Sequence, residues 1–166
     1  MLKYWLLLIT FTLGNTMNAE PLSVGSPAPS LNGILNQDNQ PINLTEKFKS
    51  GWVLVYFYPK ADTPGCTKQA CSLRDDFSIL TSKGLTVFGV STDKPEGQKA
   101  FQDKYQLPFT LLADHEEKVA KAFGVPTTLG YAKRMSFLIH DGKVVWNNLA
   151  VSVVDHLDQV KAAMGI

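Results

Sequence analysis

Residues 51–67 read GWVLVYFYPKADTPGCT, and this stretch decides the fold. The run 52–58 is continuously apolar and aromatic, and it is bounded by Gly51 and Pro59, as is typical of a strand buried on both faces. A helical pattern follows over residues 67–82, where apolar side chains recur every three or four positions until a glycine ends it. A strand that leads through a short loop into a helix predicts an α/β domain.

The rest of the chain continues this alternation of strands and helices. Residues 20–40 are rich in Pro, Gly, Ser and Asn, which predicts loops. Strands are expected around 31–35, 41–44, 85–90, 109–112, 135–139 and 144–149, and helices over 95–105, 115–123 and 153–164. The last two strands are joined through Asp141-Gly142, a strong hairpin signal. This order predicts one thioredoxin-like domain of the α/β class, with three layers and a central mixed β-sheet.

The N-terminal segment has a different character. Lys3 precedes an apolar run over 4–13 and a polar stretch that ends at Ala19, which is the order of a secretory signal peptide. The run is about half of the ~20 residues that a membrane-spanning helix needs, which counts against stable membrane insertion. We therefore expect residues 1–19 to be a signal peptide and residues 20–166 to be a domain exported to the bacterial periplasm. An uncleaved tether is the alternative.

The charge balance and the histidines exclude several classes of function. Lys and Arg total 16 and Asp and Glu total 15, so no basic surplus indicates nucleic acid as a partner. His115, His140 and His156 are scattered and have no metal-ligand spacing with the cysteines. We interpret all three as surface or loop residues, and we expect neither a metal nor a cofactor.

Cys66 lies where a thiol would be activated. Its loop follows the carboxyl end of the central strand, which is where ligands bind in open α/β sheets. Cys66 falls in the first turn of the next helix, where free amides and the helix dipole favour the thiolate. Gly65 allows close backbone approach to a small ligand. Thr63 can turn its hydroxyl toward a ligand oxygen, or it merely caps the helix.

The second cysteine, Cys71, follows five residues later. An exported protein with two cysteines ordinarily holds them as a structural disulfide. In a helix, however, this spacing separates the Cα atoms by roughly 8.6 Å, whereas a disulfide needs them within about 7 Å. Either the helix never forms here, or the bond forms only after local unwinding, and the amphipathic pattern favours the second. We expect a reversible pair.

Segment 59–67, PKADTPGCT, resembles the P-x-x-x-T-x-x-C active-site loop of peroxiredoxins. Cys71 followed by Arg74-Asp75 resembles the peroxiredoxin Q group, also called bacterioferritin comigratory proteins. The likeness covers nearly all of the chain beyond the N-terminal segment. Its further matches are Ser91-Thr92-Asp93, Lys104-Tyr105, Leu107-Pro108-Phe109, residues 111–114, Phe123-Gly124-Val125 and residues 134–139.

The resemblance implies a thiol-dependent peroxidase. Cys66 would attack the terminal oxygen of hydrogen peroxide or an organic hydroperoxide, giving a sulfenic acid and water or an alcohol. Thr63 and the Cys66 amide would bind the peroxide oxygens, and Pro59 would shield the sulfur from water. Arg134 would hold the thiolate and polarise the substrate. Cys71 would be the resolving cysteine, closing an intramolecular disulfide that a thioredoxin-like donor reduces, so that a monomer suffices.

The residues alone leave other functions open. A non-catalytic redox sensor would hold an oxidised Cys66–Cys71 pair and react slowly with peroxide. A thiol–disulfide oxidoreductase of the same fold usually carries C-x-x-C, whereas the spacing here is C-x-x-x-x-C. Arg134 could equally be an exposed arginine before a strand. Many relatives are cytosolic, so an exported member would need electrons delivered outside the cytoplasm.

Overall fold

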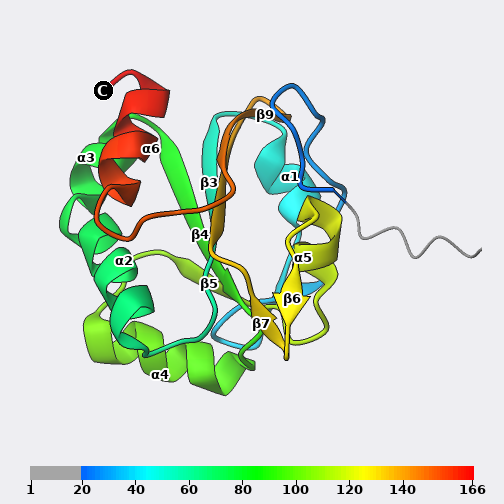
Figure 1. Ribbon diagram of the computed structural model, residues 1–166, viewed down its shortest axis with the longest axis vertical. Coiled ribbons are helices and arrows are strands. Elements are labelled where there is room, and N and C mark those ends of the chain that lie inside the picture. Colours follow the sequence, from blue (N-terminus) through cyan, green and yellow to red (C-terminus); the bar gives the residue numbers. More distant parts are fainter. Residues whose placement is uncertain (1–19) are drawn as a thin grey trace, which may run out of the picture.

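The computed structural model describes residues 20–166, so the predicted signal peptide lies outside the described residues. A five-stranded sheet forms the centre of the fold, in the order β5-β4-β3-β8-β9 (Figure 1). Its strands are β3 (Trp52–Phe57), β4 (Leu85–Ser91), β5 (Thr110–Ala113), β8 (Met135–His140) and β9 (Lys143–Asn148). The first three are parallel to one another, while β8 and β9 run antiparallel to their neighbours. The structure confirms the predicted mixed sheet and its closing hairpin.

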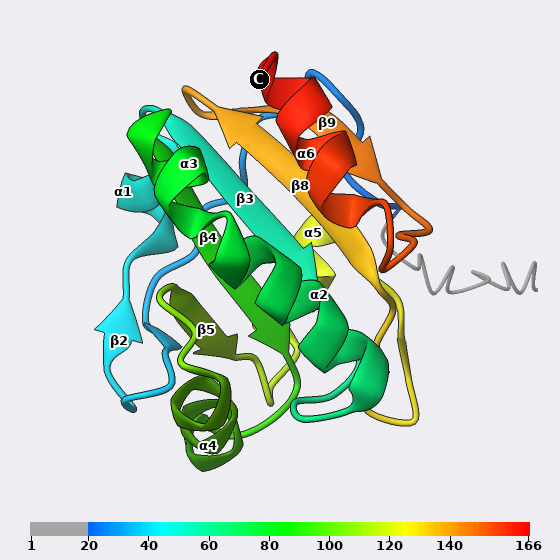
Figure 2. The ribbon, with the colours of Figure 1, turned by 90° about the vertical axis from the view of Figure 1, so that its left-hand side faces the viewer.

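Helices cover both faces of this sheet, and the central strand β3 shows why. Its side chains alternate, so that Val55 and Phe57 enter one core while Leu54 and Tyr56 enter the other. Figure 1 shows α1 (Leu44–Phe48) and α5 (Lys118–Phe123) on the first side of the sheet. The opposite side, seen face-on in Figure 2, carries α2 (Pro64–Asp75), α3 (Phe77–Ser82), α4 (Pro95–Tyr105) and α6 (His156–Met164). The predicted three-layer, thioredoxin-like arrangement is confirmed.

Two short hairpins extend beyond the sheet. The first pairs β1 (Ile34–Leu35) with β2 (Pro41–Ile42), close to the predicted positions. The second pairs β6 (Thr127–Thr128) with β7 (Tyr131–Ala132) and was not predicted. Its turn residues, Leu129 and Gly130, both have positive φ, at 53° and 79°. Two such residues in succession suit a tight hairpin turn, in which Asn-Gly is the more usual pair.

The helix predicted over 67–82 is wrong at its start and is interrupted near its middle. It begins three residues earlier, at Pro64, because proline fits the first helical position. It also breaks at Asp76, whose φ of −102° and ψ of 11° separate α2 from α3. The Asp76 carboxylate forms an ion pair with Lys161 of α6, which fixes this break against a neighbouring helix.

Three other helices differ from the predictions. Helix α1 was missed, although Asn43 accepts a hydrogen bond from the Glu46 amide in the manner of a helix cap. Helix α5 begins at Lys118 rather than at 115, because the Asp114 side chain caps the later amides. Helix α6 begins at His156 rather than at 153. None of the helices within residues 20–166 has the length and apolar character to cross a membrane.

Candidate active site

The loop between β3 and α2 is fixed to two neighbouring elements. The Asp62 carboxylate accepts hydrogen bonds from Lys104 Nζ at 2.8 Å and Tyr105 Oη at 2.7 Å, both at the end of α4. These two donors hold the pKa of Asp62 below its ordinary value. One residue earlier, the Ala61 amide donates to Asp93 Oδ2 at 2.8 Å, just beyond β4. The loop that precedes Cys66 therefore has a defined course.

These anchors explain two of the further sequence matches. Ser91-Thr92-Asp93 contains the carboxylate that receives the loop amide, and Ser91 Oγ donates to that carboxylate at 2.7 Å. Lys104-Tyr105 contains both donors to Asp62. Both groups of residues thus support the loop that precedes Cys66.

The loop delivers Cys66 to the first turn of α2. Thr63 is the residue before the helix, and its carbonyl accepts the first helical bond from the Thr67 amide at 2.8 Å. By helix geometry the amides of Gly65 and Cys66 have no intrahelical acceptor and point out of the helix start. The positive end of the helix dipole is at the same place. The Cys66 side chain is only 2 % exposed.

Arg134 contacts the sulfur from the other side of the site. It lies immediately before β8, and its Nη2 atom donates to Cys66 Sγ at 3.3 Å. A Cβ atom at position 65 would lie 3.4 Å from the same Nη2 atom, so the guanidinium packs against the backbone of Gly65. A charge-assisted donor on sulfur favours the negatively charged thiolate. The structure therefore places Arg134 in the site, partly buried, rather than as an exposed arginine before a strand.

Thr63 and Pro59 lie in the loop that precedes Cys66. Thr63 Oγ1 donates to the Lys60 carbonyl at 3.0 Å and forms no capping bond with the helix amides. Its oxygen thus keeps acceptor capacity, and the alternative of a simple helix cap does not hold for its side chain. Pro59 is partly buried and follows the buried Tyr58 at the end of the central strand.

Behind Arg134 lies a chain of polar side chains that the sequence analysis missed. Arg134 Nη1 donates to Gln69 Oε1 at 2.5 Å, and Gln69 Nε2 lies 3.1 Å from His156 Nδ1. His156 Nε2 in turn lies 2.8 Å from Ser136 Oγ. Three of these four residues, Gln69, His156 and Ser136, have no exposed surface. The chain links α2, α6 and β8 to the guanidinium that contacts Cys66.

The interpretation of His156 as a surface or loop residue was wrong. It is fully buried at the start of α6, whereas His115 is exposed and His140 is half-buried. Its position four residues before the buried Val160 places it on the apolar face of that helix, which is a signal the sequence contains. Gln69 likewise follows Cys66 at a three-residue spacing, on the same helix face.

Cys71 lies in the same helix as Cys66 and is partly buried, and both thiols are free. The segment is helical across both positions, so the alternative in which the helix never forms is wrong. The reversible disulfide between the two cysteines stays a prediction. The end of α2 is tied down nearby, because Arg74 Nη1 donates to the Tyr105 carbonyl at 2.8 Å.

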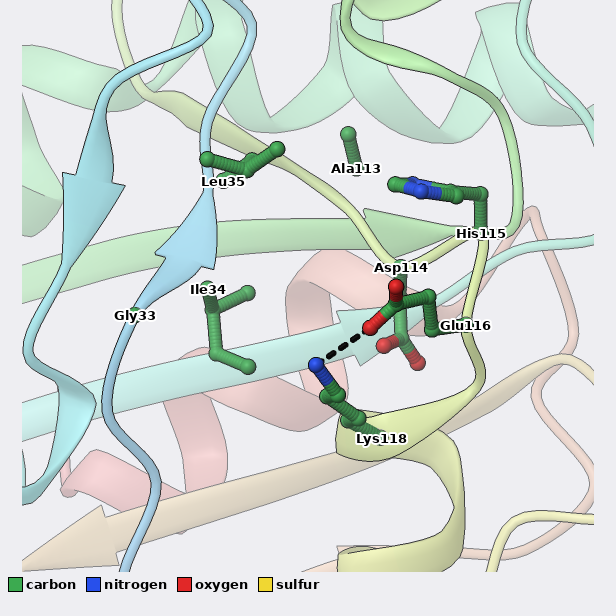
Figure 3. A pocket seen from close by; sticks show the side chains of 8 residues that line it. All are labelled: Gly33, Ile34, Leu35, Ala113, Asp114, His115, Glu116 and Lys118. Carbon is green, nitrogen blue, oxygen red and sulfur yellow. Dashed lines mark ion pairs between the residues drawn. The ribbon is translucent and has the colours of Figure 1, made fainter.

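A separate pocket lies away from the cysteines and is drawn in Figure 3. It has a volume of about 220 Å³ and is lined by Gly33–Leu35, Ala113–Glu116 and Lys118. Its acidic groups are already engaged, since Asp114 caps α5 at 2.9 and 2.8 Å and Glu116 forms an ion pair with Lys118. Burial raises the pKa of Asp114, consistent with a structural carboxyl. We assign no ligand to this pocket.

Comparison with known proteins identifies the family of this chain. Residues 24–147 match the AhpC/TSA family. Peroxiredoxin Bcp of Escherichia coli is 47% identical over 132 residues, which cover 75% of this chain and 83% of the relative. Chloroplastic peroxiredoxin Q of Sedum lineare is 49% identical over 115 residues, covering 69% of this chain and 60% of the relative.

A solved structure gives the same result at the level of the fold. Peroxidoxin BcpB of Mycobacterium tuberculosis superimposes with a TM-score of 0.80 at 31% identity, covering 87% of this chain and 97% of the other. The resemblance found in the loop before Cys66 thus extends over most of the described residues. The chain belongs to the AhpC/TSA family, and within it to the peroxiredoxins of the Bcp and peroxiredoxin Q group, which are thiol-dependent peroxidases.

Proposed function

We propose that this peroxidase uses Cys66 as its nucleophile and Cys71 as its resolving cysteine, with a thioredoxin-like dithiol as the reductant. The observation that carries the proposal is the 3.3 Å bond from Arg134 Nη2 to Cys66 Sγ at the start of α2. A buried thiol with a fixed cation on its sulfur and free helix amides beside it suits attack on a small neutral oxidant. Peroxides are of this kind.

The first step transfers one oxygen atom to sulfur. The Cys66 thiolate attacks the terminal oxygen of the hydroperoxide, a sulfur–oxygen bond forms and the oxygen–oxygen bond breaks. The leaving oxygen takes a proton and departs as water or an alcohol, and Cys66 becomes a sulfenic acid. In this proposal Arg134 stabilises the charge that develops on the leaving oxygen, while Thr63 and the Cys66 amide orient the peroxide. Pro59 keeps bulk water from the sulfur.

The second step closes a disulfide between the two cysteines. The Cys71 sulfur attacks the sulfenic sulfur, the new sulfur–sulfur bond forms, and hydroxide leaves as water after taking a proton. Helical spacing holds the two Cα atoms at roughly 8.6 Å, beyond the reach of about 7 Å for a disulfide. Helix α2 must therefore unwind locally first. A dithiol donor then returns two electrons and two protons and restores both thiols.

The proposed setting is an exported monomer. Lys3 and the apolar run over 4–13 support export, and cell fractionation of the full chain tests it. Because both cysteines lie on one helix, the cycle needs no residue from a second subunit. Light scattering of the reduced and the oxidised protein tests the monomer, and a stable dimer in both states would contradict it.

The direct test measures peroxide consumption with a dithiol reductant by the wild type, Cys66→Ser and Cys71→Ser. We expect Cys66→Ser to fall to the rate of the uncatalysed mixture. Cys71→Ser should complete one turnover and then accumulate sulfenic or over-oxidised Cys66, detected by mass spectrometry. Undiminished turnover in Cys66→Ser would refute the nucleophile. A wild type that forms the disulfide but consumes peroxide only slowly would favour the redox sensor.

Hydrogen exchange tests the unwinding separately. Oxidised protein should lose amide protection across α2, between Thr67 and Asp75, while β3 keeps its protection. Equal protection of α2 in the two states would show that the disulfide forms without unwinding.

A further inference from the structure

His156 connects two elements that meet behind the active site. Its side chain has no exposed surface. Nδ1 lies 3.1 Å from Gln69 Nε2 on α2, and Nε2 lies 2.8 Å from Ser136 Oγ on β8. The hydrogen-bonding role of each nitrogen is therefore set by what faces it, and these roles can be followed outward from Arg134.

The direction of every bond in this chain follows from the guanidinium. Arginine has donors and no acceptor, so the atom of Gln69 that faces Arg134 must be its carbonyl oxygen, Oε1. The amide nitrogen of Gln69, which can only donate, is then left facing His156. His156 Nδ1 must accept that bond, so the ring is neutral and its hydrogen is on Nε2. That hydrogen is donated to Ser136 Oγ.

We infer that His156 is a positioning residue for the peroxidase reaction: its unprotonated Nδ1 holds the Gln69 amide with Oε1 toward Arg134, and Arg134 then presents Nη2 to Cys66. The inference rests on the proposed function of Cys66. His156 contacts neither sulfur nor peroxide in this arrangement. It acts two side chains away, by fixing which end of the Gln69 amide faces the guanidinium.

The opposite amide orientation would disable the site. If His156 Nδ1 carried a hydrogen, two donors would face each other, and Gln69 would turn to offer Oε1 to the ring. The amide nitrogen would then face Arg134, again donor to donor, in a region where unsatisfied groups are costly. Arg134 would lose its fixed position on Cys66. The position of Arg134 on the Cys66 sulfur thus depends on the orientation of the Gln69 amide, which the buried ring of His156 fixes.

The groups around His156 favour the neutral ring that this role requires. The charged or titratable groups that act on it are Arg134, whose positive charge reaches the ring through space, and Tyr56 of β3, whose ring centroid lies 6.0 Å away. From α2 it meets the neutral amide of Gln69. Burial, reinforced by the positive charge of Arg134, lowers the pKa of His156 to about 4. The ring is consequently neutral near pH 7.

Two isosteric substitutions separate the two ring nitrogens. His156→Asn places an amide oxygen near the Nδ1 position and keeps an acceptor for Gln69. His156→Gln reaches the Nε2 position and keeps a partner for Ser136, but it removes that acceptor. His156→Leu fills similar space with neither. A purely structural role would make Asn and Gln equally damaging, whereas the positioning role makes them unequal.

The experiment measures the second-order rate constant for one turnover of reduced protein with hydrogen peroxide. We expect His156→Gln and His156→Leu to lose about tenfold, equal to about 1.4 kcal/mol, and His156→Asn to rescue most of that loss. Adding His156→Gln to Gln69→Ala should cost nothing further, because His156 acts through Gln69. Circular dichroism and thermal melts confirm that each variant is folded.

Nitrogen NMR supplies a second measurement that does not depend on activity. In the wild type at pH 7, His156 Nδ1 should show the chemical shift of a nitrogen with a free lone pair and Nε2 that of a protonated one. The reverse tautomer or an imidazolium would overturn the inference, as would equal rates for Asn and Gln at position 156. A wild type that fails to consume peroxide would instead overturn the proposed function, leaving the tautomer measurable.

Discussion

Lowering the pH from 7 to 5 is expected to remove about 2 kcal/mol of folding free energy through His156 alone. Burial lowers the pKa of this ring from 6.5 to about 4 in the folded protein, with the charge of Arg134 adding to the effect. The unfolded chain therefore binds more protons than the folded one between these two values. Stability from the neutral ring is fully present above pH 6.5 and is lost as the pH falls toward 4.

The size of the effect follows from the two pKa values. Each pH unit between them corresponds to about 1.4 kcal/mol, so the full difference is about 3 kcal/mol, reached below pH 4. At pH 5 about three fifths of this loss of stability has developed, which is about 2 kcal/mol. Asp114 acts in the opposite direction, because burial raises the pKa of its carboxyl and the folded state then binds the extra proton. The change of wild-type stability with pH therefore does not by itself isolate the contribution of His156.

The assay is urea unfolding of the reduced protein at pH 5, 6 and 7, for the wild type and for His156→Asn. The wild type should lose about 2 kcal/mol more than the variant between pH 7 and 5. His115→Asn is the matched control, since His115 is exposed and its replacement should leave the wild-type slope intact. Parallel slopes for the wild type and His156→Asn would refute the reasoning.

Three further predictions concern packing and backbone. Tyr56 Oη is buried and has no hydrogen-bond partner among the described residues. Tyr56→Phe should therefore leave the free energy of unfolding in urea unchanged or raise it by about 1 kcal/mol. A clear loss of stability would show that the hydroxyl is bonded. Gly89→Ala would bring a Cβ atom to 2.7 Å from Tyr56 Oη and 2.8 Å from Leu111 Cδ2. Gly89→Ala should lower the free energy of unfolding by about 1–3 kcal/mol. Adding Tyr56→Phe should restore part of that loss, because it removes the hydroxyl that the new Cβ atom meets. Leu129 is 93 % exposed and has a φ of 53°, a backbone conformation that Asn adopts more readily than Leu. Leu129→Asn should therefore stabilise the folded protein by about 1 kcal/mol, measured in a thermal melt. No increase in stability would contradict the assigned turn.

The sequence predicted the sheet well because its strands carry strong local signals. The run around Val55 is apolar on both faces, and only a strand covered on both sides accounts for it. Helix boundaries were harder, since they depend on side chains that contact distant parts of the chain. Asp76 interrupts a helical pattern and pairs with Lys161, and nothing in the spacing of apolar residues reports such a contact.

In the candidate active site too, features set by neighbouring residues could be predicted, whereas contacts between distant parts of the chain could not. The loop motif placed Cys66 at a helix start, and local geometry alone predicted that Cys71 is a reversible partner. The support behind Arg134 could not be predicted in this way, because Gln69 and His156 are 87 positions apart in the chain. A buried polar side chain is recognisable only when its partner is known, and a single sequence does not supply that partner.

The two fixed ends of α2 have a consequence for the shape of the oxidised protein. Asp62 is bonded to α4 before the helix, and Asp76 is paired with α6 after it. Five residues that pass from helical to extended backbone lengthen the chain by about 9 Å. Anchored ends cannot absorb this added contour length, so the unwound segment would have to bow outward. Oxidation would thereby raise a loop carrying Cys71 above the surface, where a reductant could reach it.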